Sequence, residues 1–332
     1  MTPTQQDAAG CYENPDRRRP RGFADLLRWK LRLGPSENSE TFPGSDGRPP
    51  YRPEVFAPDL GRIHTPDPAR IQATWVGHAT FLIQVGGLNF LTDPHWSRRA
   101  SPVPWAGPHR SVPPALAFED LPRIDAALVS HNHYDHLDRA TVRRLSARQS
   151  SHPEFQFFVP LGLGRWFARL GAPASEAGWG GQHRLRGKVT LTCVPAQHWS
   201  SRTPVDRRRS LWCGWVIETA GHRVYFAGDT GWTDGLFEDL GREQGPFDLA
   251  FLPIGAYAPR WFMADQHADP REAVRIHRAV RSRRSLGMHW GTFRLTDEPL
   301  AQPPLLLALA LAEAGVSPAE FHPARLGETL EV

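Results

Sequence analysis

The chain has 332 residues, of which 40% are hydrophobic and 22% charged, and its formal net charge is +4. This balance is typical of a folded globular protein and argues against an intrinsically disordered chain, and so small a charge gives no support for nucleic-acid binding. The three cysteines have no CxxC spacing, which argues against a disulfide framework and a cysteine zinc site and favours a reducing compartment.

Residues 1–50 are polar and rich in Pro, Gly and Arg, and they predict an N-terminal extension to a single domain over residues 51–332. The start, MTPTQQDAAG, has no apolar core and is not typical of a secretory signal. One amphipathic helix is expected over Phe23–Leu33, where leucines and Trp29 lie among basic residues. Such a helix fits an anionic membrane surface, but a helix packed on the body of the protein, or a solvated arm, is the favoured interpretation.

Short apolar runs begin near residue 70, each ended by turn residues, and their lengths favour strands. They cover Ile71–Val76, Phe81–Val85, Asn89–Leu91, Ile124–Val129, Phe155–Val159, Val189–Val194, Trp212–Glu218, Val224–Ala227 and Leu249–Leu252. Gly86 and Gly87 predict a hairpin turn. Helices are expected over Arg139–Ala147, Arg271–Arg283 and Pro304–Ala314. Strands that first meander and then alternate with helices predict an α/β layered domain. The longest apolar run has only eight residues, so no transmembrane segment is expected.

The segment SHNHYDHLD, at residues 130–138, carries the strongest chemical signal. It follows an apolar strand and precedes a helix, and it places His131, His133, Asp135 and His136 in one loop. Neutral imidazoles and carboxylates are the ligands that Zn²⁺ takes in catalytic sites. Further polar side chains follow later strands: His198 after VTLTCVPAQ, Asp229 after VYFAG and His289 after SLGM.

This ordered set resembles that of the metallo-β-lactamase fold hydrolases. The strings WVGHAT (75–80), FLTDP (90–94), FAGDTG (226–231) and above all APRWFMADQHADPREAVRIH (258–277) resemble the branch of N-acylphosphatidylethanolamine-hydrolysing phospholipase D. The resemblance covers about residues 70–330. It implies an αββα sandwich of two mixed sheets covered by helices, with residues 51–332 as the catalytic domain.

The resemblance also implies a di-zinc site. One ion would be held by His131, His133 and His198, the other by Asp135, His136 and His289, and Asp229 would bridge them. A shared carboxylate offsets the repulsion between two cations about 3.5–4 Å apart. Because His and Asp accept several divalent ions, Mn²⁺ or Fe²⁺ would also fit.

Three further residues are candidates for the site. Asp93, in LTDP, is expected to accept an N–H from a ligand histidine and so fix its tautomer. The resemblance gives His267 a catalytic role as a phosphate contact or proton donor, alongside Asp135. For His78 the sequence leaves open whether the side chain faces the site or is buried for structural reasons.

The activity implied is hydrolysis of N-acylphosphatidylethanolamine to N-acylethanolamine and phosphatidic acid. The expected partners are a phospholipid substrate and a membrane surface that the protein contacts peripherally, with no nucleic acid; the resemblance leaves a homodimer open. The expected location is the cytoplasm, including the inner face of a membrane. The alternative is a hydrolase of the same fold that acts on a soluble phosphoester or a lactone.

Overall fold

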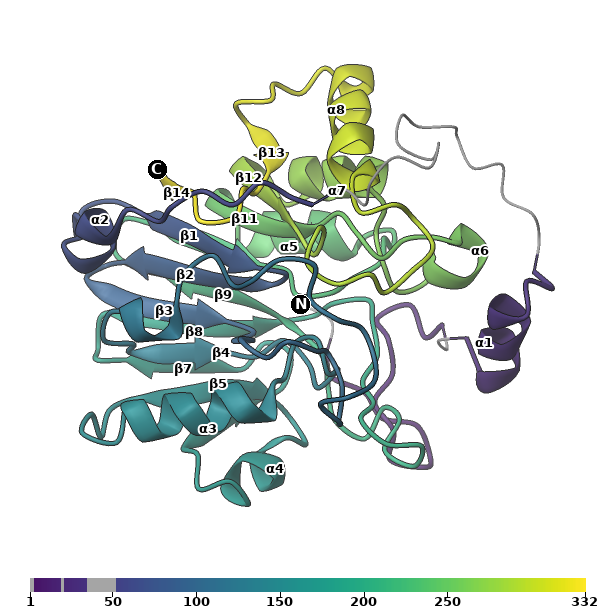
Figure 1. The fold of residues 1–332 in the computed structure, drawn as a ribbon, viewed down its shortest axis with the longest axis horizontal. Coiled ribbons are helices and arrows are strands. Elements are labelled where there is room, and N and C mark those ends of the chain that lie inside the picture. Colours follow the sequence, from purple (N-terminus) through teal and green to yellow (C-terminus); the bar gives the residue numbers. More distant parts are fainter. Residues whose placement is uncertain (1–2, 19–20, 35–51) are drawn as a thin grey trace.

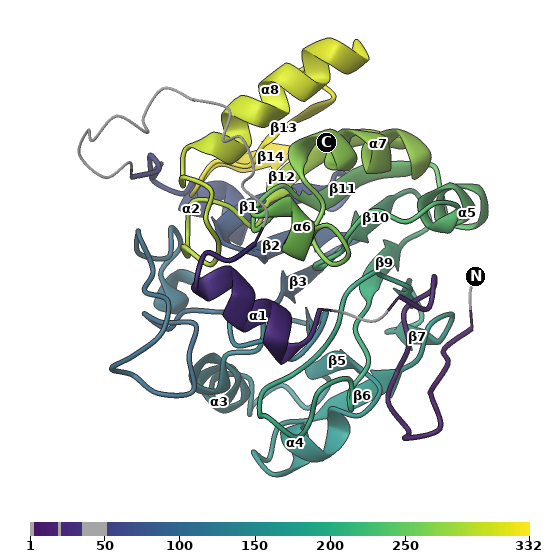
Figure 2. The same ribbon diagram turned by 90° about the vertical axis from the view of Figure 1, so that its right-hand side faces the viewer.

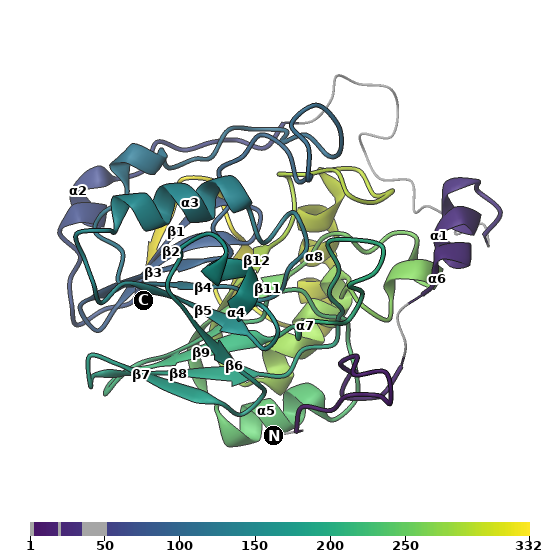
Figure 3. The same ribbon diagram turned by 90° about the horizontal axis from the view of Figure 1, so that it is seen from below.

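The computed structural model describes residues 3–18, 21–34 and 52–332. Two seven-stranded mixed sheets pack face to face with helices on their outer faces, as the views in Figures 1 and 3 show. This αββα sandwich confirms the expected fold class. The predicted boundary at residue 50 lies outside the described residues, so the division into extension and domain stays a prediction.

The first sheet has the strand order β14-β1-β2-β3-β4-β5-β6. Strands β1 to β3 form an antiparallel meander, and β3 to β6 run parallel. Gly86 and Gly87 both have a positive φ, as the tight hairpin turn between β2 and β3 requires. The bounds are β1 Gln72–Gly77, β2 Thr80–Val85, β3 Leu88–Thr92, β4 Ala126–Leu128, β5 Gln156–Pro160, β6 Ala174–Ala177 and β14 Thr329–Glu331.

The second sheet has the order β13-β12-β11-β10-β9-β8-β7. Strands β7 to β10 are antiparallel and β10 to β13 are parallel. Strands β8 and β10 are both antiparallel to β9, and β12 runs parallel to β10, so β8, β10 and β12 point in the same direction. Their C-termini therefore lie at the same end of this sheet. The bounds are β7 Gln182–Leu185, β8 Val189–Val194, β9 Gly214–Glu218, β10 Arg223–Phe226, β11 Phe247–Pro253, β12 Ser282–Met288 and β13 Phe321–Pro323.

The helices begin where the sequence provides caps. The Asp138 carboxylate accepts the N–H of Ala140 at the start of α3, and Asp269 forms a capping box with Glu272 at the start of α7. The bounds are α1 Phe23–Lys30, α2 Leu60–His64, α3 Arg139–Arg148, α4 Gly164–Ala168, α5 Leu236–Glu243, α6 Arg260–Met263, α7 Pro270–Ala279 and α8 Gln302–Ala314, with a 3₁₀ turn over Phe118–Asp120. Within the described ranges, no helix is long and apolar enough to span a bilayer.

Two predicted helices are too long. The helix expected over Phe23–Leu33 ends at Lys30, with Leu31 as its C-cap. The prediction for Arg271–Arg283 is wrong at its C-terminal end, because α7 stops at Ala279 and Ser282 already begins β12. Arg281 adopts a left-handed φ of +60°, which ends the helix, and the strand that follows is paired on both sides, to β11 and β13. Sheet pairing therefore decides the structure of a segment whose arginines are equally compatible with a helix.

The largest apolar cluster lies between the sheets and under α5, α7 and α8, and it includes Trp75, Trp215 and Phe226. A second cluster, with Phe157 and Leu145, fills the space between the first sheet and the helices α2, α3 and α4. This packing holds the two sheets together so that the loops after β4, β8, β10 and β12 leave the sandwich at one end (Figure 2).

Candidate metal centre

The loop between β4 and α3 carries four of the predicted ligands at this end of the sandwich. Its far end is tied to α3 by the Asp138 cap. The Arg202 guanidinium, from the loop after β8, donates to the carbonyls of Asn132 and Leu137 at 2.9 and 2.7 Å. These bonds hold the histidine-rich loop against the loop that carries His198.

Three histidines form a first group. His131 Nε2 and His198 Nε2 lie 2.9 and 3.2 Å from His133 Nδ1. Two of these rings come from the loop after β4 and the third from the loop after β8, and all three are fully or largely buried.

A second group lies beside the first. His136 Nε2 is 3.1 Å from His289 Nε2, and Asp135 Oδ2 lies 3.2 and 3.3 Å from these two nitrogens. Asp229 Oδ2 lies between the two groups, at 3.1 Å from the Nε2 atoms of both His136 and His289, 3.8 Å from His198 Nε2 and 4.0 Å from His131 Nε2. The structure thus brings together all seven residues that the sequence singled out.

Hydrogen bonds behind the histidines determine which ring nitrogen carries the proton. Asp93 Oδ2 lies 2.7 Å from His136 Nδ1, and a carboxylate can only accept, so that nitrogen holds the hydrogen. The carbonyl of Gln266 fixes His198 in the same way, 2.8 Å from its Nδ1. Both rings therefore turn Nε2 towards the centre. Burial keeps His198 neutral, so its Nε2 carries no proton. Burial also opposes the charged form of His136, but Asp229, Asp135 and Asp93 outweigh it and raise its pKa well above the ordinary value, so a metal ion would take the place of the proton on this Nε2.

His131 is oriented by a residue that the sequence analysis missed. Ser130 Oγ donates to Asp93 Oδ2 at 2.6 Å, so it accepts the N–H of His131 Nδ1 at 2.9 Å. Asp93 thus supports His136 directly and His131 through Ser130. The signal was present, because Ser130 directly precedes the HNHYDH segment, but only the tertiary structure brings Asp93 to it.

The donor set fits divalent cations. The Nε2 atoms of His131, His136 and His198 all lie 3.1–4.0 Å from Asp229 Oδ2, and His136 Nε2 is also 3.1 Å from His289 Nε2. Asp229 Oδ1, His133 Nε2 and His289 Nδ1 are buried without a partner among the described residues. Acceptors collected in this way repel one another unless positive charge lies between them, and imidazole with carboxylate is a common donor set for divalent transition metals.

The electrostatics differ between the two groups. Burial lowers the pKa of His133 to about 3 and that of His198 to about 4, so both rings are neutral and free to coordinate. Burial also opposes the charged form of His289, but Asp229 and Asp135 outweigh it and raise its pKa to about 9. In the absence of a metal the second group therefore attracts positive charge, which is the condition for a cation site.

His267 and His78 contact different carboxylates of the centre, Asp229 and Asp135 respectively. His267 Nδ1 is 3.8 Å from Asp229 Oδ2, and its ring is 5.0 Å from that of His198. Arg260 donates to the carbonyl of His267 and pairs with Glu272, which fixes the segment after α6. The His78 side chain faces the centre, because its Nε2 is 2.8 Å from Asp135 Oδ2.

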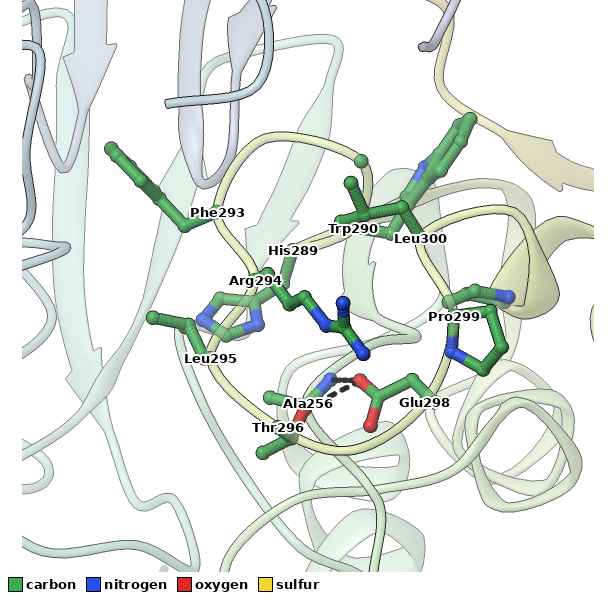
Figure 4. A pocket seen from close by; sticks show the side chains of 12 residues that line it. Ala256, His289, Trp290, Phe293, Arg294, Leu295, Thr296, Glu298, Pro299 and Leu300 are labelled. Atoms are coloured by element: carbon green, nitrogen blue, oxygen red, sulfur yellow. Dashed lines mark hydrogen bonds between the residues drawn. The ribbon is translucent and has the colours of Figure 1, made fainter. Parts of the chain in front are cut away.

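The loop after His289 forms part of the surrounding wall. It encloses a pocket of about 10 Å³, lined by His289, Arg294 and Glu298 among others (Figure 4). The Glu298 carboxylate accepts the N–H groups of Ala256 and Ala258 at 2.7 and 3.0 Å. A space of this size holds about one water molecule and is too small for a substrate.

The N-terminal segment also reaches the centre, which sequence analysis did not predict. Tyr12 is part of the main apolar cluster. Asn14 Oδ1 accepts the backbone N–H of His198 at 3.0 Å, and Asp16 accepts from Gln197 at 2.9 Å. No local pattern in residues 3–18 signals these contacts, because their partners lie more than 180 residues away.

Comparisons with known proteins show the family of the chain. The Beta-lactamase superfamily domain matches residues 88–290. The chain is 46% identical over 241 residues to N-acyl-phosphatidylethanolamine-hydrolyzing phospholipase D 1 of Caenorhabditis elegans, covering 70% of this chain and 67% of that protein. It is 32% identical over 262 residues to the Saccharomyces cerevisiae protein named N-acyl-phosphatidylethanolamine-hydrolyzing phospholipase D, mitochondrial, covering 77% of this chain and 55% of that one. The aligned region thus spans between about half and two thirds of these relatives.

The fold is also similar to that of solved metallohydrolases. Igni18, a metallo hydrolase from Ignicoccus hospitalis, superposes with a TM-score of 0.60 at 22% identity, covering 79% of this chain and 98% of that one. At this identity the likeness extends to the fold and no further.

Proposed function

Because the chain belongs to the beta-lactamase superfamily, in the branch of the N-acyl-phosphatidylethanolamine-hydrolysing phospholipases D, and is a metal-dependent hydrolase, we propose that its substrate is an N-acylphosphatidylethanolamine. Water adds to phosphorus, the bond from phosphorus to the ethanolamine oxygen breaks, and the products are an N-acylethanolamine and phosphatidic acid. The convergence of seven His and Asp side chains at one end of the sandwich is the observation that carries this proposal.

The proposed ligands are His131, His133 and His198 for one Zn²⁺ and Asp135, His136 and His289 for the other, with Asp229 between them. Ions held there would neutralise charge on the phosphoryl oxygens and would make water a better nucleophile at neutral pH. The hydrogen bonds of Asp93, Ser130 and Gln266 support the assignment, because they leave the Nε2 atoms of three histidines free for coordination.

His267 is proposed as the group that assists departure of the ethanolamine oxygen. Its side chain is 12% exposed, and its Nδ1 lies 3.8 Å from Asp229 Oδ2. Burial lowers the pKa of His267 well below its ordinary value, so the ring is neutral and keeps one N–H. That N–H can donate to the leaving oxygen as negative charge develops there.

Helix α1 supports a lipid substrate. It lies at the same end of the molecule as the site loops, beside α6 (Figures 1 and 2). Trp29 is buried against Phe262 and donates its indole N–H to Asp297 at 2.6 Å, while Leu27 and Leu31 are 49% and 57% exposed. Exposed leucines among Arg28, Lys30 and Arg32 are typical of a helix at an anionic membrane surface. We therefore propose peripheral membrane contact through α1; the cytoplasmic location and the homodimer stay predictions.

Activity on defined lipids tests the substrate. Metal-loaded protein is incubated with N-acylphosphatidylethanolamine in mixed micelles and, in parallel, with soluble phosphodiesters and lactones, and the products are identified by mass spectrometry. We expect equal amounts of N-acylethanolamine and phosphatidic acid, and no product after chelation. Turnover of the soluble compounds alone would favour the alternative hydrolase and overturn the proposal.

Co-sedimentation with vesicles tests the membrane contact. Replacing Leu27 and Leu31 by Ser is expected to reduce binding to anionic vesicles, and binding of the wild type should weaken as salt is raised. The matched control replaces Leu305 and Leu309, which are similarly exposed on α8, by Ser. Equal binding by both double variants would remove the role proposed for α1.

A further inference from the structure

His78, at the turn between β1 and β2, has an unusual backbone that the surrounding structure maintains. Its φ of +57° lies in the left-handed region, which is unfavourable for a residue other than glycine. Its N–H donates to Thr292 Oγ1 at 2.8 Å, and its carbonyl accepts the indole N–H of Trp75 at 2.9 Å. Strained conformations that are held from two sides are common where a side chain must be aimed.

The side chain of His78 contacts two residues of the metal centre, Asp135 and His289. The His78 ring is fully buried and lies 4.0 Å from the ring of His289, measured between centroids. Its Nε2 is 2.8 Å from Asp135 Oδ2, and because a carboxylate cannot donate, Nε2 holds the proton. Its Nδ1 has no partner among the described residues. Among the described residues, the only hydrogen-bond partner of this ring is therefore Asp135.

A purely structural role does not explain this arrangement. An apolar side chain would fill the same space without burying an unpaired nitrogen, which is costly away from water. The oxygen that His78 contacts is the same Oδ2 that faces the Nε2 atoms of His136 and His289. A donor at this point limits the orientations that the Asp135 carboxylate can adopt.

We propose that His78 is a positioning residue that holds the Asp135 carboxylate towards the His136 and His289 side of the centre. The inference rests on the proposed function, because it assigns Asp135 to a metal. It completes a pattern: Asp93, Ser130 and Gln266 each fix one ligand histidine, and His78 does the same for the carboxylate. Outer partners of this kind typically contribute about 10- to 100-fold to metal affinity.

Two substitutions separate the hydrogen bond from the fold. Asn tolerates a left-handed φ, so His78→Asn is expected to fold, but its amide is too short to reach Asp135. Gln places an amide nitrogen at the same distance along the side chain as Nε2, so His78→Gln restores a donor. The control is His277→Asn, which removes a buried histidine on α7 whose Nδ1 contacts Ser285 Oγ at 2.8 Å.

The readout is stepwise Zn²⁺ binding, measured by competition with a chromophoric chelator, together with metal content and metal-free melting temperature. We expect His78→Asn to weaken one of two binding steps by about 10- to 100-fold, and His78→Gln to recover most of that loss. His277→Asn should lower the melting temperature and leave both steps unchanged.

The outcomes are distinguishable. If the wild type binds no second ion, the metal centre of the proposed function fails whatever His78 does. If the wild type binds two ions and His78→Asn binds both as tightly, the positioning role is overturned. If His78→Asn and His78→Gln lose affinity equally, the hydrogen bond is not the cause and the inference fails as well.

Discussion

Asp93→Asn tests the reasoning about tautomers most directly, because one buried carboxylate serves two histidines of the centre. An amide at position 93 can face His136 Nδ1 and Ser130 in two ways. It presents either its N–H group or an uncharged oxygen where Asp93 presents a charged carboxylate oxygen. If the amide N–H faces His136, the ring must accept at Nδ1 and move its own proton to Nε2, which is the atom that faces the metal position. The substitution changes no ligand and almost no volume.

The expected loss of metal affinity follows from the two ligand histidines that Asp93 supports. Asp93 contacts His136 at 2.7 Å and reaches His131 through Ser130 at 2.6 and 2.9 Å. Each outer partner typically contributes about 10- to 100-fold to metal affinity, so losing support for two ligands is expected to weaken binding by at least about 100-fold. Activity at limiting metal should fall in parallel and recover in part at high metal.

Chelator competition measures the affinity, and thermal melting without metal measures the effect on the fold. The matched control is Asp125→Asn, which removes another buried carboxylate near the opposite end of β4 that accepts from Asn89 N at 2.8 Å. That control should lower stability and leave metal affinity unchanged. Wild-type affinity in Asp93→Asn, or an equal loss in the control, would refute the argument.

Three further predictions concern the same centre. Asp229→Asn should lower kcat/KM for lipid by more than roughly 100-fold, the upper end of the loss typical when a residue that only supports a metal ligand is replaced. The reason is that Asp229 Oδ2 lies between the two groups of proposed ligands, beside His136 in one and His198 in the other. A folded variant with wild-type turnover would contradict this. Ser130→Ala should weaken Zn²⁺ binding by about 10-fold, less than Asp93→Asn, because it disturbs His131 alone; chelator competition ranks the two variants. The metal-free protein should melt at lower temperature as pH rises from 6.5 towards 9. In the folded protein the pKa of His289 is raised to about 9, from an ordinary value of 6.5. Its charge, paired with Asp229 and Asp135, therefore stabilises the fold fully below pH 6.5, and this stabilisation is lost as the pH rises towards 9. Melting curves in chelator check this, and a melting temperature that rises with pH would contradict it.

Nine of the fourteen strands and four of the eight α-helices in the described part of the chain could be predicted, because local patterns specify them. Apolar runs of three to seven residues became strands within about two residues of their predicted ends, and Asp138 and Asp269 mark two helix starts. The exception, at Ser282, lies in a segment that sheet pairing decides. Short edge strands such as β6, β7 and β13 have weak patterns, and their structure depends on their neighbours.

For the centre, the chain itself specified the chemistry of the donors and their order, since three histidines and an aspartate in one loop after a strand indicate a metal site. Only the tertiary structure decided which nitrogen of each imidazole ring faces the centre and which groups form hydrogen bonds with the other nitrogen. Ser130, Asn14 and His78 act through partners 37 to 184 residues distant. A hydrogen bond depends on atoms a few ångströms apart in space, and only the packing of two sheets brings such distant segments together.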